Sequence, residues 1–88
     1  NTICDGLRAQ VGSITFPIIK ELVDGIIVVP EEDIIKSLKL ILERLKIVVE
    51  PSCSIALAAV IKEKLIFKNK NIGIILTGGN IDLSQFPW

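Results

Sequence analysis

The sequence predicts an α/β fold, on three observations. Two short apolar runs rich in β-branched residues, at 26–29 and 72–76, have the composition of buried strands. Elsewhere, apolar residues recur at spacings of three and four, as on one face of a helix. Helix and strand patterns that alternate in this way favour parallel strands with helices packed on the sheet. Because two strands alone are marginal, we expect the remaining strands to come from sequence outside this chain.

The first predicted helix covers residues 15–22. Two turn signals precede it, Asp5-Gly6 and Gly12-Ser13, so that stretch is predicted to be loop with at most a short helical turn. Pro17 lies near the predicted helix start, where proline is tolerated, and Asp24-Gly25 ends the helix. The apolar residues at helical spacing are Phe16, Ile19, Leu22 and Val23.

Two longer helices are predicted to begin at prolines. Pro30 is followed by three carboxylates, which the positive end of a helix dipole favours. Pro51 opens a helix that runs through Ile61, and its small alanines permit close approach to a sheet. The apolar stripe of the helix after Pro30 consists of Ile34, Leu38, Ile41 and Leu45, joined by Ile35 and Leu42.

Composition disfavours several functional classes. The 10 basic and 10 acidic residues are dispersed and aromatic residues make up 5% of the chain, so a nucleic-acid partner is not expected. The longest apolar run, 55–61, is far shorter than the roughly 20 residues that span a bilayer. Cys4 and Cys53 lie far apart and histidine is absent, which predicts reduced thiols and no metal site. Without a recognisable targeting sequence, the expected location is cytoplasmic.

The chain is expected to be a piece of a longer protein. It contains no methionine, and 50% of its 88 residues are hydrophobic. Small domains bury proportionally less of their surface, so this composition would leave apolar faces uncovered. We therefore expect a partner surface that this chain does not contain.

Three places could carry chemistry, and each has a simpler structural explanation. Thr77, Gly78 and Gly79 follow the second predicted strand, where open α/β sheets bind ligands, but paired glycines also make tight turns. Glu50 ends an apolar run before a helix, which it could simply cap. Gly6 could let a flat ligand approach the backbone, or could only form a turn.

A similarity that extends along the whole chain identifies a protein family more specifically than any single motif does. The chain resembles the final quarter of serine racemases and the related biodegradative threonine dehydratases over practically all of its 88 residues. The segments that carry this resemblance are Thr2-Ile3-Cys4-Asp5-Gly6-Leu7, Phe16-Pro17-Ile18-Ile19, Val23-Asp24, Glu43-Arg44-Leu45-Lys46, Val49-Glu50-Pro51 and Leu76-Thr77-Gly78-Gly79-Asn80-Ile81-Asp82-Leu83.

This resemblance implies a pyridoxal-phosphate enzyme of fold type II, the tryptophan synthase β-like architecture. Residues 1–88 would be the C-terminal segment of its large cofactor-binding domain, with no complete second domain. The remainder of the subunit, a homodimer and a serine or threonine substrate are the implied partners. This chain alone would be inactive, because the family's Schiff-base lysine follows a serine-phenylalanine pair and Phe67-Lys68 lacks the serine.

The same resemblance assigns roles to five residues. Thr77 would contact the pyridine nitrogen of the cofactor, while Gly6 and Glu50 would lie beside the ring. Family members usually have serine where this chain has Thr77, so the hydroxyl is kept and a methyl group is added. Lys46 and Asn80 match positions that help to hold ATP in nucleotide-activated racemases, so activation by ATP and by a divalent metal is a hypothesis.

Another class of function stays open from the sequence alone. A stand-alone α/β module could hold an anion or a nucleotide with the backbone amides of residues 77–79. Within the resembled family, the sequence does not separate racemase from dehydratase, or a preference for serine from one for threonine.

Overall fold

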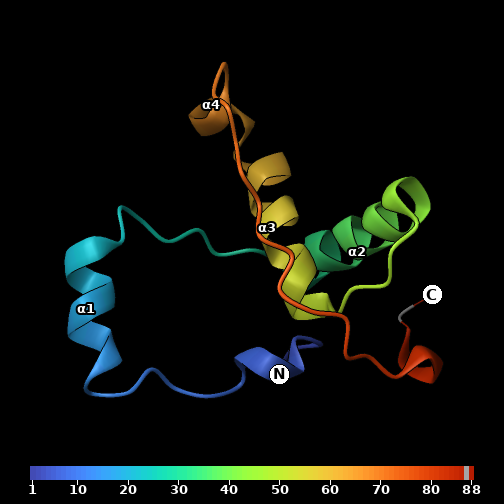
Figure 1. Ribbon diagram of the computed structural model, residues 1–88, viewed down its shortest axis with the longest axis horizontal. Coiled ribbons are helices and arrows are strands. Elements are labelled where there is room, and N and C mark those ends of the chain that lie inside the picture. The colour runs from blue at the N-terminus through green and yellow to red at the C-terminus, as the bar shows by residue number, and fades with distance from the viewer. Residues whose placement is uncertain (87) are drawn as a thin grey trace.

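The centre of the structure is a pair of packed helices, α2 (Glu31–Leu45) and α3 (Pro51–Lys62) (Figure 1). This computed structural model describes residues 1–86 and 88. The other helices are short: α1 (Thr15–Leu22), α4 (Lys64–Phe67) and the 3₁₀ turns η1 (Asp5–Leu7) and η2 (Leu83–Gln85). Helix α1 therefore confirms the predicted range 15–22, and α2 and α3 begin where Pro30 and Pro51 predicted.

Four buried residues form the core between α2 and the start of α3, namely Leu38, Ile41, Val49 and Cys53. The half-buried side chains of Leu57, Leu76 and Phe86 pack against them. Leu76 and Phe86 come from the C-terminal part of the chain, which turns back after α4 and returns along α3 (Figure 1). The predicted stripe on α2 is thus largely correct, although Leu45 at its end is 58% exposed.

A buried hydroxyl forms a polar link between the two helices. Ser54 on α3 is fully buried, and its Oγ lies 3.1 Å from the carbonyl oxygen of Ile34 on α2 and 2.9 Å from that of Pro51. The hydroxyl therefore donates to a backbone acceptor where water cannot reach it, as buried polar groups require.

Helix α2 ends at Leu45, and the following Lys46 adopts the left-handed conformation with φ 58°. Its backbone N–H donates to the carbonyl oxygen of Leu42 at 3.1 Å. Glycine is the usual residue in this conformation at a helix end, so a lysine here is uncommon. The turn directs residues 47–50 back along the core toward α3.

Helix α1 stands apart from the α2–α3 pair, on extended arms (Figure 1). In the described part of the chain it contacts no other helix, and Leu22 and Phe16 on its apolar face are 73% and 56% exposed. Lys62 Nζ holds the following arm by donating to the carbonyl oxygen of Val28 at 2.7 Å. The amphipathic pattern of α1 thus predicted a helix correctly, but its apolar face has no partner within the described residues.

The strands predicted at 26–29 and 72–76 do not form in residues 1–86 and 88, so the prediction of a parallel sheet is not confirmed. A strand is stabilised by hydrogen bonds to neighbouring strands, and an isolated pair is marginal. One backbone hydrogen bond joins the residues before α3 to the residues after the second predicted strand: the Glu50 N–H donates to the Gly78 carbonyl oxygen. Within the described residues, no helix is both long enough and apolar enough to cross a membrane.

Candidate cofactor site

Two segments distant in sequence meet at the N-terminal end of α3. Glu50 is the residue before the helix, and its backbone N–H donates to the carbonyl oxygen of Gly78 at 3.0 Å. A Cβ atom on Gly79 would lie 2.6 Å from the backbone oxygen of Val48, and one on Gly78 would lie 3.2 Å from Glu50 Oε1. No described glycine has a positive φ. These two glycines therefore allow the chain to pass close to Val48 and Glu50, and no unusual turn conformation requires them.

A third segment reaches the same helix end. The turn η1 contacts α3, and a Cβ atom on Gly6 would lie 3.4 Å from Ser52 Oγ. Gly6 and Glu50 are therefore brought together with Gly78, the residue directly after Thr77. Thr77 itself is exposed and Glu50 is half-buried.

A cleft of about 860 Å³ opens beside this convergence. Of the residues expected to bind ligands, Glu50 and Asn80 line it, whereas Gly6, Thr77 and Lys46 do not. Lys46 is exposed directly after α2, two residues before Val48, and does not line the cleft, so the ATP hypothesis stays a prediction. Its charged lining is mostly acidic and consists of Asp5, Glu31, Glu50 and Asp82 with Arg8. Among the described residues, no group of three or more His, Cys, Asp or Glu side chains is arranged so that it could hold a metal ion.

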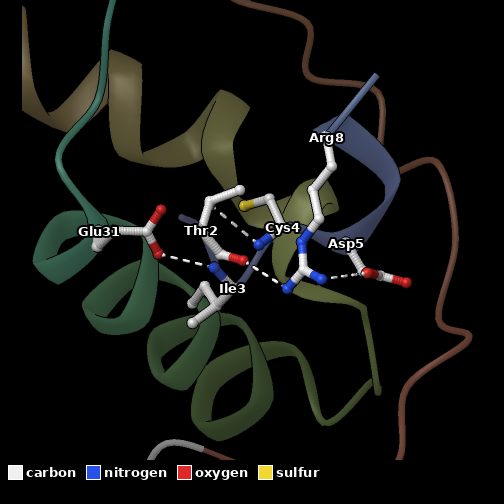
Figure 2. A network of polar contacts seen from close by, with 6 residues as sticks. All are labelled: Thr2, Ile3, Cys4, Asp5, Arg8 and Glu31. Carbon is white, nitrogen blue, oxygen red and sulfur yellow. Dashed lines mark hydrogen bonds and ion pairs between the residues drawn. The ribbon is translucent and has the colours of Figure 1, made fainter.

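A polar network on the cleft wall holds the N-terminal segment (Figure 2). Glu31, the first residue of α2, accepts the backbone N–H of Ile3 through Oε2 at 3.0 Å. Arg8 Nη2 donates to the carbonyl oxygen of Thr2 at 2.8 Å, and its Nη1 lies 3.0 Å from Asp5 Oδ1. The Thr2 hydroxyl accepts the backbone N–H of Cys4 at 3.1 Å. The segment is thus closed on itself by Arg8 and tied to α2 by Glu31.

Two ionisable groups in this region, Glu31 and Cys4, have pKa values that are shifted from their usual range. Hydrogen bonds from the Thr2 hydroxyl and the Ile3 N–H hold the pKa of the Glu31 carboxyl below its usual range. Burial raises the pKa of the Cys4 thiol, and the nearby carboxylates of Glu31 and Glu50 raise it further. Cys4 is 1% exposed, so at neutral pH it is a protonated, shielded thiol rather than a nucleophile.

The lowered pKa of Glu31 makes a pH-dependent contribution to stability. Because the folded-state pKa lies below the unfolded value of about 4.3, this contribution is complete above about pH 4.3 and is lost as the pH falls through the folded value. We expect the stability difference between wild type and Glu31→Gln to be constant from about pH 6 to 8 and to shrink below about pH 4.3. Urea unfolding of both proteins across this range measures the difference. A difference that persists unchanged at acid pH would contradict the expectation.

Residues 1–78 match the family model described as pyridoxal-phosphate dependent enzyme. The chain belongs to this family. The resemblance of this sequence to pyridoxal-phosphate enzymes is therefore confirmed. Members of this family use pyridoxal phosphate as cofactor, so the convergence at α3 is its candidate site.

Three relatives show how far the similarity extends. The serine racemase of Dictyostelium discoideum is 54% identical over 97% of this chain and 27% of the relative, and its crystal structure matches with a TM-score of 0.86 over 94% of this chain. The β-hydroxyaspartate dehydratase of Paracoccus denitrificans is 38% identical over 99% of this chain and 28% of the relative. The crystal structure of a T.th. threonine deaminase gives a TM-score of 0.87 at 40% identity, over 93% of this chain and 27% of that structure. The chain thus shares its fold with these enzymes while spanning little more than a quarter of their length.

The residues at the N-terminal end of α3 fit one side of a pyridoxal-phosphate site. Glycine at positions 6 and 78 brings two backbone segments close to the polar side chains of Ser52 and Glu50, and a side chain at either glycine would fill that space. The Phe67-Lys68 pair lies at the opposite end of α3, beyond the start of α4, so it is not placed to serve this site.

Sequence reasoning missed Glu31, Ser52 and the close approach of Gly79 to Val48. Glu31 was explained by the helix dipole alone, and its hydrogen-bond partner lies 28 residues away. Ser52 lies directly after the helix-starting Pro51 and carried no local signal. The Gly78-Gly79 pair did carry a signal, but a tight turn explained it equally well.

Proposed function

We propose that this chain is the C-terminal part of a pyridoxal-phosphate-dependent serine/threonine dehydratase or serine racemase. The observation that carries the proposal is the convergence of Gly6, Glu50 and Gly78 at one end of α3, in a chain of this enzyme family. We place residues 1–88 in the large cofactor-binding domain of fold type II, where residues 26–29 and 72–76 would join a parallel sheet. The 40–54% identity to serine racemases and to the threonine deaminase supports this class over a stand-alone anion-binding module.

In this proposal the chain supplies one face of the cofactor pocket. Pyridoxal phosphate, when bound, acts as an electron sink for bonds at the α-carbon of an amino acid. Thr77 Oγ1 would hydrogen-bond the pyridine nitrogen, and a neutral hydroxyl does not hold a proton there as a carboxylate would. Gly6 and Glu50 would border the ring, and Ser52 would offer a further hydroxyl. No covalent attachment by this segment is proposed.

The remainder of the same subunit is the proposed partner. It would supply the Schiff-base lysine and the phosphate-binding loop, and it would cover apolar side chains that this chain leaves open. Ile26, Val28 and Ile75, in the segments predicted as strands, are largely exposed, at 81%, 79% and 80%. Homodimerisation, activation by ATP or a divalent metal, and a cytoplasmic location stay predictions.

Cofactor binding by the full-length protein tests this function. We expect stoichiometric binding of pyridoxal phosphate, detected by absorbance, and a reduced cofactor–lysine adduct outside residues 1–88 after borohydride treatment and mass spectrometry. Assays with L-serine and L-threonine, scoring keto acid against D-serine, would then separate dehydratase from racemase. A full-length protein that binds no cofactor, or that acts on neither amino acid, would contradict the proposal.

Substitution of Thr77 tests the pyridine contact. Thr77→Ala is expected to weaken cofactor binding about 2- to 12-fold, the equivalent of one neutral hydrogen bond of about 0.5–1.5 kcal/mol. Thr77→Ser keeps the hydroxyl and is the matched control, with affinity close to wild type. Equal affinities of the alanine and serine variants would remove Thr77 from the site.

A further inference from the structure

We infer that Glu31 is a positioning residue, whose carboxylate holds residues 2–6 against the N-terminal end of α3 and so places Gly6 beside Ser52. The link to cofactor binding rests on the function proposed above. The claim that Glu31 holds this segment stands on its own geometry.

The segment behaves as one unit with few external anchors. Arg8 closes it internally through the Thr2 carbonyl and Asp5, and the Leu7 N–H donates to the Cys4 carbonyl at 3.0 Å. A unit closed in this way moves as a body unless something outside it fixes its position. Its connections to the rest of the described chain include the hydrogen bonds from the Ile3 N–H and the Thr2 hydroxyl to Glu31, a hydrogen bond between the Cys4 thiol and Ser52, and the packing of η1 on α3.

Glu31 is well placed for this role because two structural elements meet at its side chain. Its backbone begins α2, which is anchored in the core through Leu38 and Ile41. Its carboxylate reaches the backbone two residues before η1, with Oε2 3.0 Å from the Ile3 nitrogen (Figure 2). A hydrogen bond to an ionised acceptor is stronger than one between neutral groups. Glu31 therefore transmits the rigidity of α2 to the segment that carries Gly6.

The buried thiol of Cys4 reports whether the segment is docked. Cys4 lies in the docked segment and is 1% exposed, whereas Cys53 is 2% exposed within the α2–α3 core and serves as the internal reference. In the full-length apo-protein, Glu31→Ala is expected to raise the alkylation rate of Cys4 roughly tenfold relative to Cys53, the effect of losing one charge-assisted hydrogen bond on local opening. Iodoacetamide labelling followed by peptide mass spectrometry measures both rates in one sample.

Two further variants separate positioning from general destabilisation. Glu31→Gln keeps an acceptor oxygen and should restore much of the Cys4 protection that Glu31→Ala loses. Glu32→Ala changes the neighbouring exposed carboxylate and should leave both rates at wild-type values. In the pyridoxal-phosphate titration, Glu31→Ala should bind the cofactor more weakly than Glu31→Gln and alter the fluorescence of the bound cofactor.

The outcomes are distinguishable. An alkylation rate of Cys4 that stays equal to wild type in Glu31→Ala would overturn the claim that Glu31 holds the segment. Exposure of Cys4 with unchanged cofactor affinity and fluorescence would overturn its role in positioning the site. If the wild-type protein binds no pyridoxal phosphate, the proposed function fails, while the alkylation rates still decide whether Glu31 holds the segment.

Discussion

Leu38→Ala is expected to reduce the free energy of unfolding by about 2–5 kcal/mol, because it removes a large side chain from the centre of the core. Leu38 is 1% exposed and belongs to the buried cluster with Ile41 of its own helix and Val49 and Cys53 of the facing segments. Alanine would lose these contacts and leave a cavity that helices anchored on both sides cannot fully close. Because this core positions the 46–50 turn, cofactor binding should weaken as well.

Urea unfolding of the full-length apo-protein, followed by circular dichroism, measures the effect of Leu38→Ala. Lys39→Ala is the matched control, since it alters the adjacent exposed position of the same helix and should change stability by less than about 0.5 kcal/mol. Equal stabilities for the two variants would contradict the assignment of Leu38 to the core.

Gly79→Ala is expected to destabilise the protein by about 1–3 kcal/mol through overpacking. The added Cβ would lie 2.6 Å from the backbone oxygen of Val48, so a backbone segment rather than a flexible side chain must move. That movement would separate residues 77–79 from Glu50, and we expect cofactor affinity to fall together with stability.

Gly73→Ala provides the control for Gly79→Ala in the same segment. A Cβ atom at Gly73 meets no heavy atom within 4 Å, and φ at this position is not in the left-handed region. Alanine there should be neutral, or stabilising by up to about 1 kcal/mol because it restricts the unfolded chain. Comparable losses at positions 73 and 79 would argue against close packing as the reason for Gly79.

The helices could be predicted from the sequence because their signals are local. Pro30 with three following carboxylates, and Pro51, mark the starts of α2 and α3, and the spacing of Ile34, Leu38 and Ile41 predicts the buried face of α2. The short helix α4 and the turn η2 were not predicted. Asp82 caps η2 by accepting the Ser84 N–H at 2.9 Å, a contact that spans only two residues but lies within a tail of little periodicity.

The strands could not be verified within this chain, for a physical reason. A run such as 72–76 can form a strand only if a neighbouring strand completes its hydrogen bonds, and the neighbours are not among the described residues. The single bond between Glu50 and Gly78 is the part of such a pairing that the chain makes by itself.

The candidate site could be predicted in part. The resemblance to a known family selected Gly6, Glu50 and Thr77 from segments far apart in the sequence, and the structure brings the first two and the neighbour of the third to one helix end. Glu31 could not be selected, because its partner is a backbone N–H, which no residue type signals. The joint role of Lys46 and Asn80 in holding ATP stays a prediction, since Asn80 lines the acidic cleft and Lys46 does not.

The most direct test of the proposed function is a crystal structure of the full-length protein with pyridoxal phosphate bound. We expect Thr77 Oγ1 within about 2.6–3.2 Å of the pyridine nitrogen, with Gly6 and Glu50 in contact with the ring. A cofactor bound elsewhere in the protein, or a Thr77 hydroxyl that faces solvent in the complete subunit, would contradict it.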